Sequence, residues 1–163
     1  MGVQMLIGGI VGDVDPDHPR NVAEAVLQPL EQFSTEMIVL PKCYDLFSGK
    51  LLWEHADKTC FTQWQSGTGP HATPTVDAGR VYTYGATGLL NCLDAATGQL
   101  IWQHSVLAEN DLPVSKWGAS SSPLLVDNRV VVTGGETLGP TLLAFQRDTG
   151  APLWKTGSVT SPG

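Results

Sequence analysis

The sequence has few charged residues, and most of those it has are acidic. Charged residues make up only 15% of the chain, with 9 Lys and Arg against 16 Asp and Glu, so the formal charge at pH 7 is −7. Because contact with a phosphate backbone requires a basic surface, we predict that the protein does not bind nucleic acid.

Long apolar runs are also missing. No run approaches the ~18 residues that a membrane-spanning helix needs, so we predict no transmembrane segment. The apolar segment 5–11 is short, no basic residue precedes it, and Asp13, Asp15 and Asp17 follow it. It does not have the form of a secretory signal, and no signal peptide is visible in this chain.

Cysteines are scarce and unpaired in sequence. The 3 cysteines are Cys43, Cys60 and Cys92, and no two of them form a CxxC pair. This spacing indicates neither a zinc site nor a disulfide framework. Cys43 and Cys92 occupy equivalent positions of a repeated segment, which would place them too far apart for a bridge. We therefore interpret them as small buried residues.

The repeat is the most informative feature that is present. Segments 43–53, 92–102 and 144–154 each begin with a small residue, continue into a polar turn that ends in Ser/Thr-Gly, and close with Trp. The first two copies have Asp at the third position, whereas the last has Gln146. Self-similarity at about 50 residues predicts stacked supersecondary units.

Each copy has the composition of a β-hairpin, because two short apolar runs flank a turn that ends in Gly. Glycine can adopt positive φ there, and the Asp or Ser/Thr side chain can bond the open backbone groups. A Trp of one unit could then lie flat over the glycine turn of a neighbouring unit. The residues assigned to this structural motif are Cys43, Asp45, Gly49, Trp53, Cys92, Asp94, Thr97, Gly98, Trp102, Ala144, Thr149, Gly150 and Trp154.

This pattern resembles the tryptophan-docking motif of PQQ-like β-propeller repeats, a family that includes quinoprotein alcohol dehydrogenases and BamB-type outer-membrane assembly proteins. The resemblance covers residues 33–163. It implies an all-β fold, a β-propeller of four-stranded antiparallel blades, of which this chain supplies a partial ring of about two to three. It also implies a periplasmic or cell-envelope location. Further blades or further copies of the chain would be needed to close the ring.

Within residues 33–163 we expect a partial blade at 33–55 and two fuller blades at 72–104 and 120–155. The expected strands are 36–45, 50–55, 72–76, 80–84, 89–94, 100–104, 122–126, 129–133, 141–146 and 153–155. Pro41 predicts a bulge or a sheet edge. Residues 1–32 do not match the repeat, so we interpret them as an extension or a degraded blade, with two helical turns at 21–28 before Pro29.

The resemblance implies a specific active site in the family's dehydrogenases. They hold PQQ with Ca²⁺ and use a vicinal Cys-Cys disulfide, a Trp, carboxylate and amide ligands, and an Asp base. This chain has no adjacent cysteines, and its one Glu/Asn/Asp cluster, 109–111, is interpreted as a solvated turn. We therefore assign no catalytic, cofactor-binding or metal-binding residue, and expect PQQ and Ca²⁺ only if the chain belongs to such a dehydrogenase.

Two long connections, 56–71 and 105–119, are expected to emerge on one face of the ring. They carry Trp64, His71 and Trp117, which we predict to form a binding face, because aromatic residues on long loops mark binding patches. Alternatively, these loops only cover blade edges.

Together these features favour a non-catalytic PQQ-like propeller module that acts as a protein-interaction scaffold in the cell envelope, with a partner still to be identified. One alternative is a fragment of a PQQ-dependent quinoprotein oxidoreductase of the alcohol dehydrogenase type. Another is a truncated reading frame without a function of its own.

Overall fold

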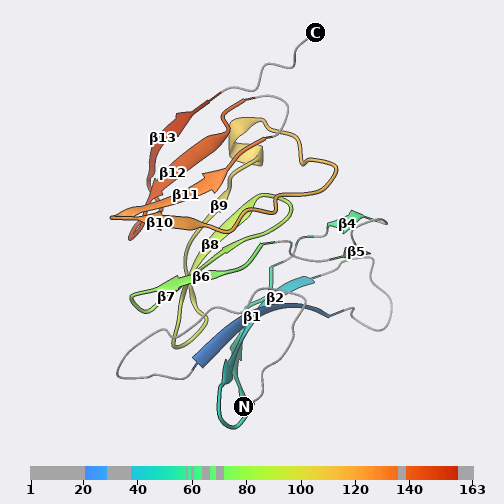
Figure 1. Cartoon of the computed structure of the whole chain (residues 1–163), viewed down its shortest axis with the longest axis vertical. Coiled ribbons are helices and arrows are strands. Elements are labelled where there is room, and N and C mark those ends of the chain that lie inside the picture. The colour runs from blue at the N-terminus through green and yellow to red at the C-terminus, as the bar shows by residue number, and fades with distance from the viewer. Residues whose placement is uncertain are drawn as a thin grey trace.

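The chain folds as stacked antiparallel β-sheets (Figure 1). The computed structural model describes residues 21–28, 38–57, 59, 61–63, 67–68, 72–135 and 139–157. These residues form 13 strands and one short 3₁₀ helix, η1 (Ala108–Asn110). None of the helical structure in these ranges is long and apolar enough to span a membrane. The predicted all-β class is confirmed.

Three sheets make up the body of the molecule. The first contains β1 (Asn21–Gln28), β2 (Ile38–Asp45) and β3 (Leu51–Glu54). The second contains β6 (Thr75–Asp77), β7 (Arg80–Tyr84), β8 (Leu89–Asp94) and β9 (Leu100–Ser105). The third contains β10 (Leu124–Val126), β11 (Arg129–Thr133), β12 (Leu142–Gln146) and β13 (Pro152–Thr156). A small hairpin of β4 (Thr62–Gln63) and β5 (Gly67–Thr68) lies between the first two sheets in sequence.

The second and third sheets are four-stranded meanders, as the repeat predicts. Their strands lie close to the predicted ranges, except that β6 begins at Thr75 and not at Ala72, and β10 begins at Leu124 and not at Ser122. The repeat also holds in the strand register, since the opening small residue of each motif pairs with its closing Trp in all three sheets. A register shift follows that pair in every sheet, so the three units share one local geometry.

The prediction of helical turns at 21–28 is wrong, because this segment is strand β1. It pairs with β2 over its whole length, from Asn21 opposite Asp45 to Gln28 opposite Ile38. The sequence NVAEAVLQ has good helix formers, but the open edge of β2 offers a complete ladder of backbone partners. Tertiary pairing therefore overrides the local helix propensity.

The prediction of a bulge or edge at Pro41 holds only in part: Pro41 does not lie on an edge strand, but the ladder between β2 and β3 ends beside it, at Lys42. Pro41 lies within β2, the middle strand of the first sheet. Its carbonyl accepts a hydrogen bond from the backbone N–H of His55 at 2.9 Å, just beyond the end of β3 at Glu54. On that side no strand residue faces the proline nitrogen, so the missing N–H interrupts no ladder.

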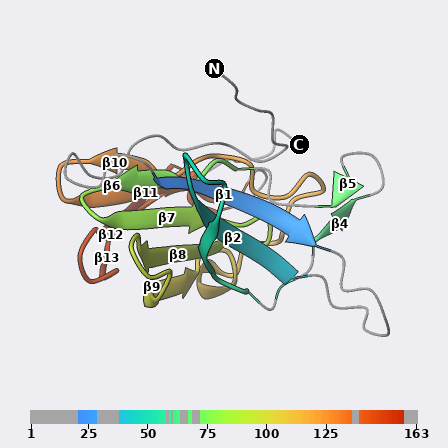
Figure 2. The same ribbon diagram turned by 90° about the horizontal axis from the view of Figure 1, so that it is seen from below.

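The sheets are stacked face to face, with the first at the bottom of Figure 1 and the third at the top. From below, β1 and β2 lie in front of the second sheet and run obliquely to its strands (Figure 2). Side chains alternate between the two faces of each strand, so the second sheet contributes to two cores. The core shared with the third sheet comprises Tyr82, Tyr84, Leu90, Cys92, Trp102, Val106, Val130, Val132, Leu143 and Phe145. The core shared with the first comprises Cys43, Trp53, Val81, Leu93 and Ala95.

Candidate functional site

The structure brings Trp53 of the first sheet onto the glycine turn of the second. Its Nε1 donates a hydrogen bond to the carbonyl oxygen of Ala95 at 2.8 Å. Gly98 lies beneath the ring with φ +73°, and a Cβ there would come within 2.5 Å of Trp53 Cε3. The turn itself is held by Asp94 Oδ1, which accepts hydrogen bonds from the backbone N–H and the hydroxyl of Thr97.

Trp102 makes the same contact with the third sheet. Its Nε1 donates to the carbonyl oxygen of Arg147 at 3.0 Å, and a Cβ on Gly150 would lie 2.8 Å from Trp102 Cδ2. Gln146 replaces the Asp of the other turns, and its Oε1 accepts from the N–H and hydroxyl of Thr149 at 2.7 and 2.5 Å. The turn needs an acceptor oxygen at this position, and an amide supplies it as well as a carboxylate.

The carboxylates of these turns are committed to backbone geometry. Hydrogen bonds from the side chain and backbone of Thr97 lower the pKa of Asp94. Asp45 Oδ1 accepts from the N–H and hydroxyl of Ser48 at 2.8 and 2.6 Å in the equivalent turn of the first sheet. These contacts stabilise the ionised acid, which is the opposite of what a general acid at neutral pH requires.

Ion pairs cross the junction between the second and third sheets. Arg80 Nη1 lies 3.0 Å from Asp148 Oδ1, and the guanidinium of Arg147 pairs with Asp77. Arg147 Nε also donates to the hydroxyl of Tyr82 at 3.2 Å. Each pair joins an inner strand of the second sheet to the turn of the third, so charge supplements the docked ring at this junction.

Cys43 and Cys92 are free thiols in different sheets. Their exposed fractions are 1% and 0%, which confirms that they are small buried residues. Burial raises the pKa of Cys43 to about 11 and also raises the pKa of Cys92. Neither fits the quinone-facing disulfide that the resemblance implies.

The described side chains also do not fit a calcium site. Among them, no three or more His, Cys, Asp or Glu residues converge as a metal would require. The predicted solvated turn at 109–111 lies in and after η1, where Glu109 accepts from the N–H of Ser105 and contacts His104 Nδ1, both at 2.8 Å. We therefore derive no chemical step through PQQ or Ca²⁺ from these residues.

The two long connections meet at the loop between β7 and β8. The hydroxyls of Thr59 and Thr87 lie 2.8 Å apart, which ties the first connection to this loop. The second is tied there by Ala119, whose N–H donates to the carbonyl of Ala86 at 2.8 Å. The connections also touch each other, because a Cβ on Gly118 would come 3.1 Å from the ring of Phe61.

Trp117 is the described member of the predicted binding face, and its exposed fraction is 45%. Lys116 Nζ lies 5.0 Å from the centroid of its ring, within range of a cation–π interaction. The backbone N–H of Trp117 donates to Ser115 Oγ, and the Ser115 hydroxyl donates to the carbonyl of Gly118. Trp64 and His71, the other predicted members, lie outside the described residues.

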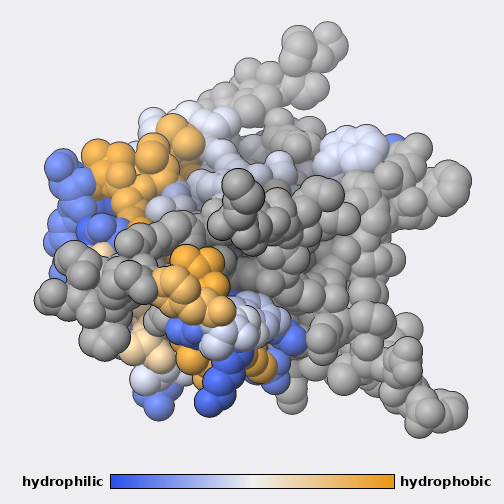
Figure 3. Space-filling view, turned by 60° about the horizontal axis from the view of Figure 1, so that its bottom comes forward, coloured by the Kyte–Doolittle hydropathy of each residue, from blue (hydrophilic) through white to orange (hydrophobic). Residues whose placement is uncertain are grey.

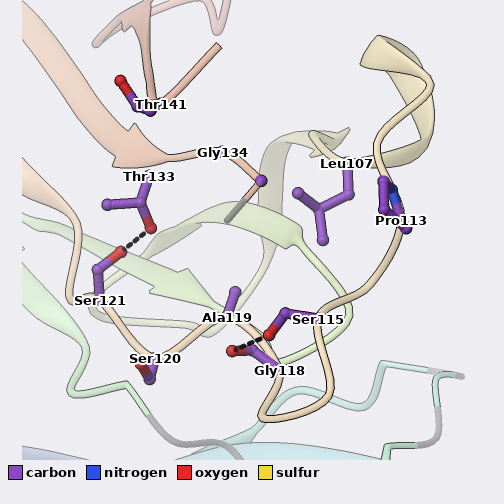
Figure 4. Close-up of a pocket in the computed structure, with 11 residues that line it drawn as sticks. Leu107, Pro113, Ser115, Gly118, Ala119, Ser120, Ser121, Thr133, Gly134 and Thr141 are labelled. Atoms are coloured by element: carbon purple, nitrogen blue, oxygen red, sulfur yellow. Dashed lines mark hydrogen bonds between the residues drawn. The ribbon is translucent and has the colours of Figure 1, made fainter. Parts of the chain in front are cut away.

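A cavity of about 420 Å³ is lined by residues of the second connection on either side of Trp117 in sequence, among them Ser115 and Gly118 (Figure 4). Its walls are apolar at Leu107, Pro113 and Ala119. The rest of the lining consists of three glycines, at 118, 134 and 135, and of the hydroxyl-bearing residues Ser115, Ser120, Ser121, Thr133 and Thr141. Ser121 and Thr133 are linked through their hydroxyls at 2.6 Å. Sequence analysis missed this cavity; the run Ser120-Ser121-Ser122 was its only signal. We call the Trp117 side chain, the segment 115–121 and this cavity the connection face.

A buried polar cluster fixes the first connection against the second sheet. Asn91 Nδ2 donates to Asp57 Oδ2 at 2.6 Å, Gln103 Nε2 donates to Asn91 Oδ1 at 2.7 Å, and His55 Nε2 lies 3.3 Å from Asp57 Oδ1. Asp57 and Asn91 have exposed fractions of 7% and 1%. The sequence contains no recognisable signal for this cluster, because its members come from three separate elements.

Stacked four-stranded antiparallel sheets with a common register define this chain as part of a β-propeller. It belongs to a family of PQQ-like propeller repeats: a family model described as outer membrane protein assembly factor BamB matches residues 38–162. Among known proteins, the chain is 26% identical to the dehydrogenase subunit of alcohol dehydrogenase (quinone) from Gluconacetobacter polyoxogenes and to that from Komagataeibacter europaeus. Each alignment covers 92% of this chain and 21% of the relative, so the chain spans about a fifth of their length.

Solved structures show the same fold. BamB from Moraxella catarrhalis superimposes with a TM-score of 0.57 and 19% identity, over 91% of this chain and 36% of that one. Quinohemoprotein alcohol dehydrogenase from Comamonas testosteroni gives 0.55 and 17%, over 91% and 22%. The fold is thus shared by an assembly factor and by oxidoreductases.

Proposed function

We propose that this chain is a segment of a PQQ-like β-propeller that acts as a non-catalytic scaffold, and that it binds a protein partner through the connection face. The observation that carries the proposal is the meeting of both long connections at the β7–β8 loop, where the second connection carries the exposed Trp117 and lines a cavity. A rigid aromatic anchor next to a pocket is a common arrangement at the centre of protein interfaces.

The roles of the candidate catalytic groups support a scaffold. The acids of the repeated turns hold backbone groups, and the two described thiols are buried with pKa values raised by burial. The description of the matching family, an outer membrane assembly factor, supports a location in the cell envelope and a protein partner.

A second candidate function is part of a PQQ-dependent oxidoreductase. It is favoured by the two relatives named as alcohol dehydrogenase (quinone) subunits. In that case the site would draw most of its ligands from blades outside this chain. Titration of a full-length version of the protein, containing the complete propeller, with PQQ and Ca²⁺, followed by tryptophan fluorescence and dye-linked alcohol oxidation, distinguishes the two. The scaffold predicts no saturable quenching and no oxidation, and the enzyme predicts both.

The scaffold proposal is tested by replacing Trp117 and, in a second variant, both Trp64 and Trp117 with Ala. Proteins retained from an envelope extract are quantified for each variant and for wild type. Ile101→Ala is the matched control, because Ile101 is 43% exposed on β9, outside the connection face. We expect one or more partners to be lost with Trp117→Ala and kept with the control. Folded variants that retain every partner would contradict the proposal.

A further inference from the structure

The contact of a Trp ring with a glycine turn occurs twice between neighbouring sheets, at Trp53 and at Trp102. The first sheet has a further glycine turn, and the third sheet a further Trp. Trp154 is 42% exposed, whereas the docked rings of Trp53 and Trp102 are 7% and 8% exposed. In the first sheet Gly49 has φ +65°, and no atom of the described residues lies within 4 Å of the position of a Cβ. Among the described residues, one end thus presents a ring with no glycine turn beneath it, and the other a glycine turn with no Trp ring over it.

The two halves are built like their counterparts in the interior. Trp154 pairs with Ala144 in the register that joins Trp102 to Cys92. The Gly49 turn is closed by the hydrogen bond from the Gly49 N–H to the Asp45 carbonyl at 2.9 Å, and Gly98 makes the same bond at 2.8 Å. Both halves are therefore preformed for the contact that the interior sheets make.

The surroundings of the two halves match in polarity. On the face that carries Trp154, Leu124 and Val126 are 59% and 44% exposed. Beside Gly49, Leu46 is 59% exposed and Phe47 66%. Viewed from the end where β2 and β3 lie, the surface carries hydrophobic patches among hydrophilic side chains (Figure 3). Leu46 and Phe47 occupy the turn positions that Arg147 and Asp148 hold in the third sheet. Apolar contacts would therefore take the place of ion pairs.

We propose that a second copy of this chain docks head to tail on the first, with the ring of Trp154 over the Gly49 turn of the second copy. The Nε1 of Trp154 would donate to the carbonyl of Leu46, as Trp53 donates to Ala95 and Trp102 to Arg147. The occupant is a second copy because one chain carries both complementary halves, and the new interface continues the series already formed inside it. Such a heterologous contact closes a ring or extends as a filament.

Sedimentation velocity over about 1 to 100 µM tests the proposal on the whole 163-residue chain. We expect wild type to associate with concentration, and Trp154→Ala to weaken association at least about tenfold. Gly49→Asn should do the same, because Asn tolerates positive φ and Gly49 has open space, yet the new side chain occupies the place of the docked ring. Gly79→Asn is the matched control, with φ +74° and equally open space in the second sheet.

Mixing the two defective variants gives the sharpest result. Trp154→Ala retains its turn and Gly49→Asn retains its ring, so together they can form one junction only. We expect a one-to-one dimer and no larger species. Association lost in Trp154→Ala but unchanged in Gly49→Asn would overturn the proposal in favour of a face-to-face dimer. A wild-type monomer at every concentration would also overturn it and would assign both faces to further propeller sheets. Near-UV circular dichroism verifies that each variant is folded.

Discussion

At the scale of single residues, the contact between sheets depends on the absence of a side chain. Gly98 and Gly150 adopt positive φ and also leave room for an indole ring, so they meet two requirements at once. The residue that builds each turn is less restricted. Asp94 and Gln146 differ in charge, but each offers one oxygen to two donors of the following Thr.

Comparing Gly150→Ala with Gly79→Ala separates the two requirements, positive φ and room for the indole ring. The Cβ would strain the backbone by about 1–2 kcal/mol and also collide with Trp102, which costs about 1–3 kcal/mol more. Gly79→Ala is the control, since its φ of +74° is the same but no atom of the described residues is within 4 Å. We expect urea unfolding to show a clearly larger loss for Gly150→Ala. Equal losses would mean that the ring contributes nothing.

The buried thiol of Cys43 predicts a pH dependence of stability. Its pKa is raised from 9.0 to about 11 in the folded protein, so the unfolded chain releases the proton first as pH rises. The stabilisation is complete below pH 9 and is lost between pH 9 and 11, by up to about 2–3 kcal/mol. Cys43→Ala removes the contribution of this thiol and fits the site, because Ala144 holds the equivalent position. The buried thiol of Cys92, whose pKa is also raised, still contributes in both proteins. Wild type and variant that lose stability in parallel over this range would contradict the assignment.

At the scale of elements, most strands could be predicted from the sequence, because turn glycines, closing tryptophans and alternating apolar residues recur at one period. The segment 21–28 was mispredicted as helix, since its residues have helix propensity and its real determinant is the edge of β2, which local sequence does not contain. The sequence also predicted that both long connections lie on one face, but it did not predict the cavity that the second connection lines. That cavity depends on how the segment 115–121 packs against β11 and the loop that follows it.

The Asp57 cluster determines where the first connection lies on the second sheet. Asp57→Ala leaves the buried amide of Asn91 without its closest acceptor, so we expect a loss of about 1–3 kcal/mol in the free energy of unfolding. In an Asn91→Leu background the loss should be smaller, because no amide remains to be satisfied and Leu143 occupies the equivalent position in the third sheet.

A control for this cycle is Asp127→Ala. The Asp127 side chain is 81% exposed and lies 3.4 Å from Arg129, and a surface pair of this kind contributes little. The hydrogen bond between Asp57 and Asn91 predicts that the losses of unfolding free energy in Asp57→Ala and Asn91→Leu are not additive. Additive losses in the double variant would show that the two side chains are not coupled and would contradict this account.

At the scale of the whole molecule, the fold and the proposed function depend on different parts of the chain. Strands and turns make the stack of sheets, and the same stack is found in BamB and in quinohemoprotein alcohol dehydrogenase. The scaffold proposal assigns function to the connections, which are tied by hydrogen bonds to the β7–β8 loop. Fold similarity therefore does not distinguish a scaffold from an enzyme, and the test of the scaffold has to be made on the residues of the connection face.

Site-specific photocrosslinking tests the connection face most directly. A photoreactive amino acid is placed at position 117 in one variant and at position 101 in another, because Trp117 and Ile101 are 45% and 43% exposed on different surfaces. The scaffold proposal predicts a discrete protein adduct in the source cells from position 117 and none from position 101. The same adducts from both positions, or none from position 117, would contradict it.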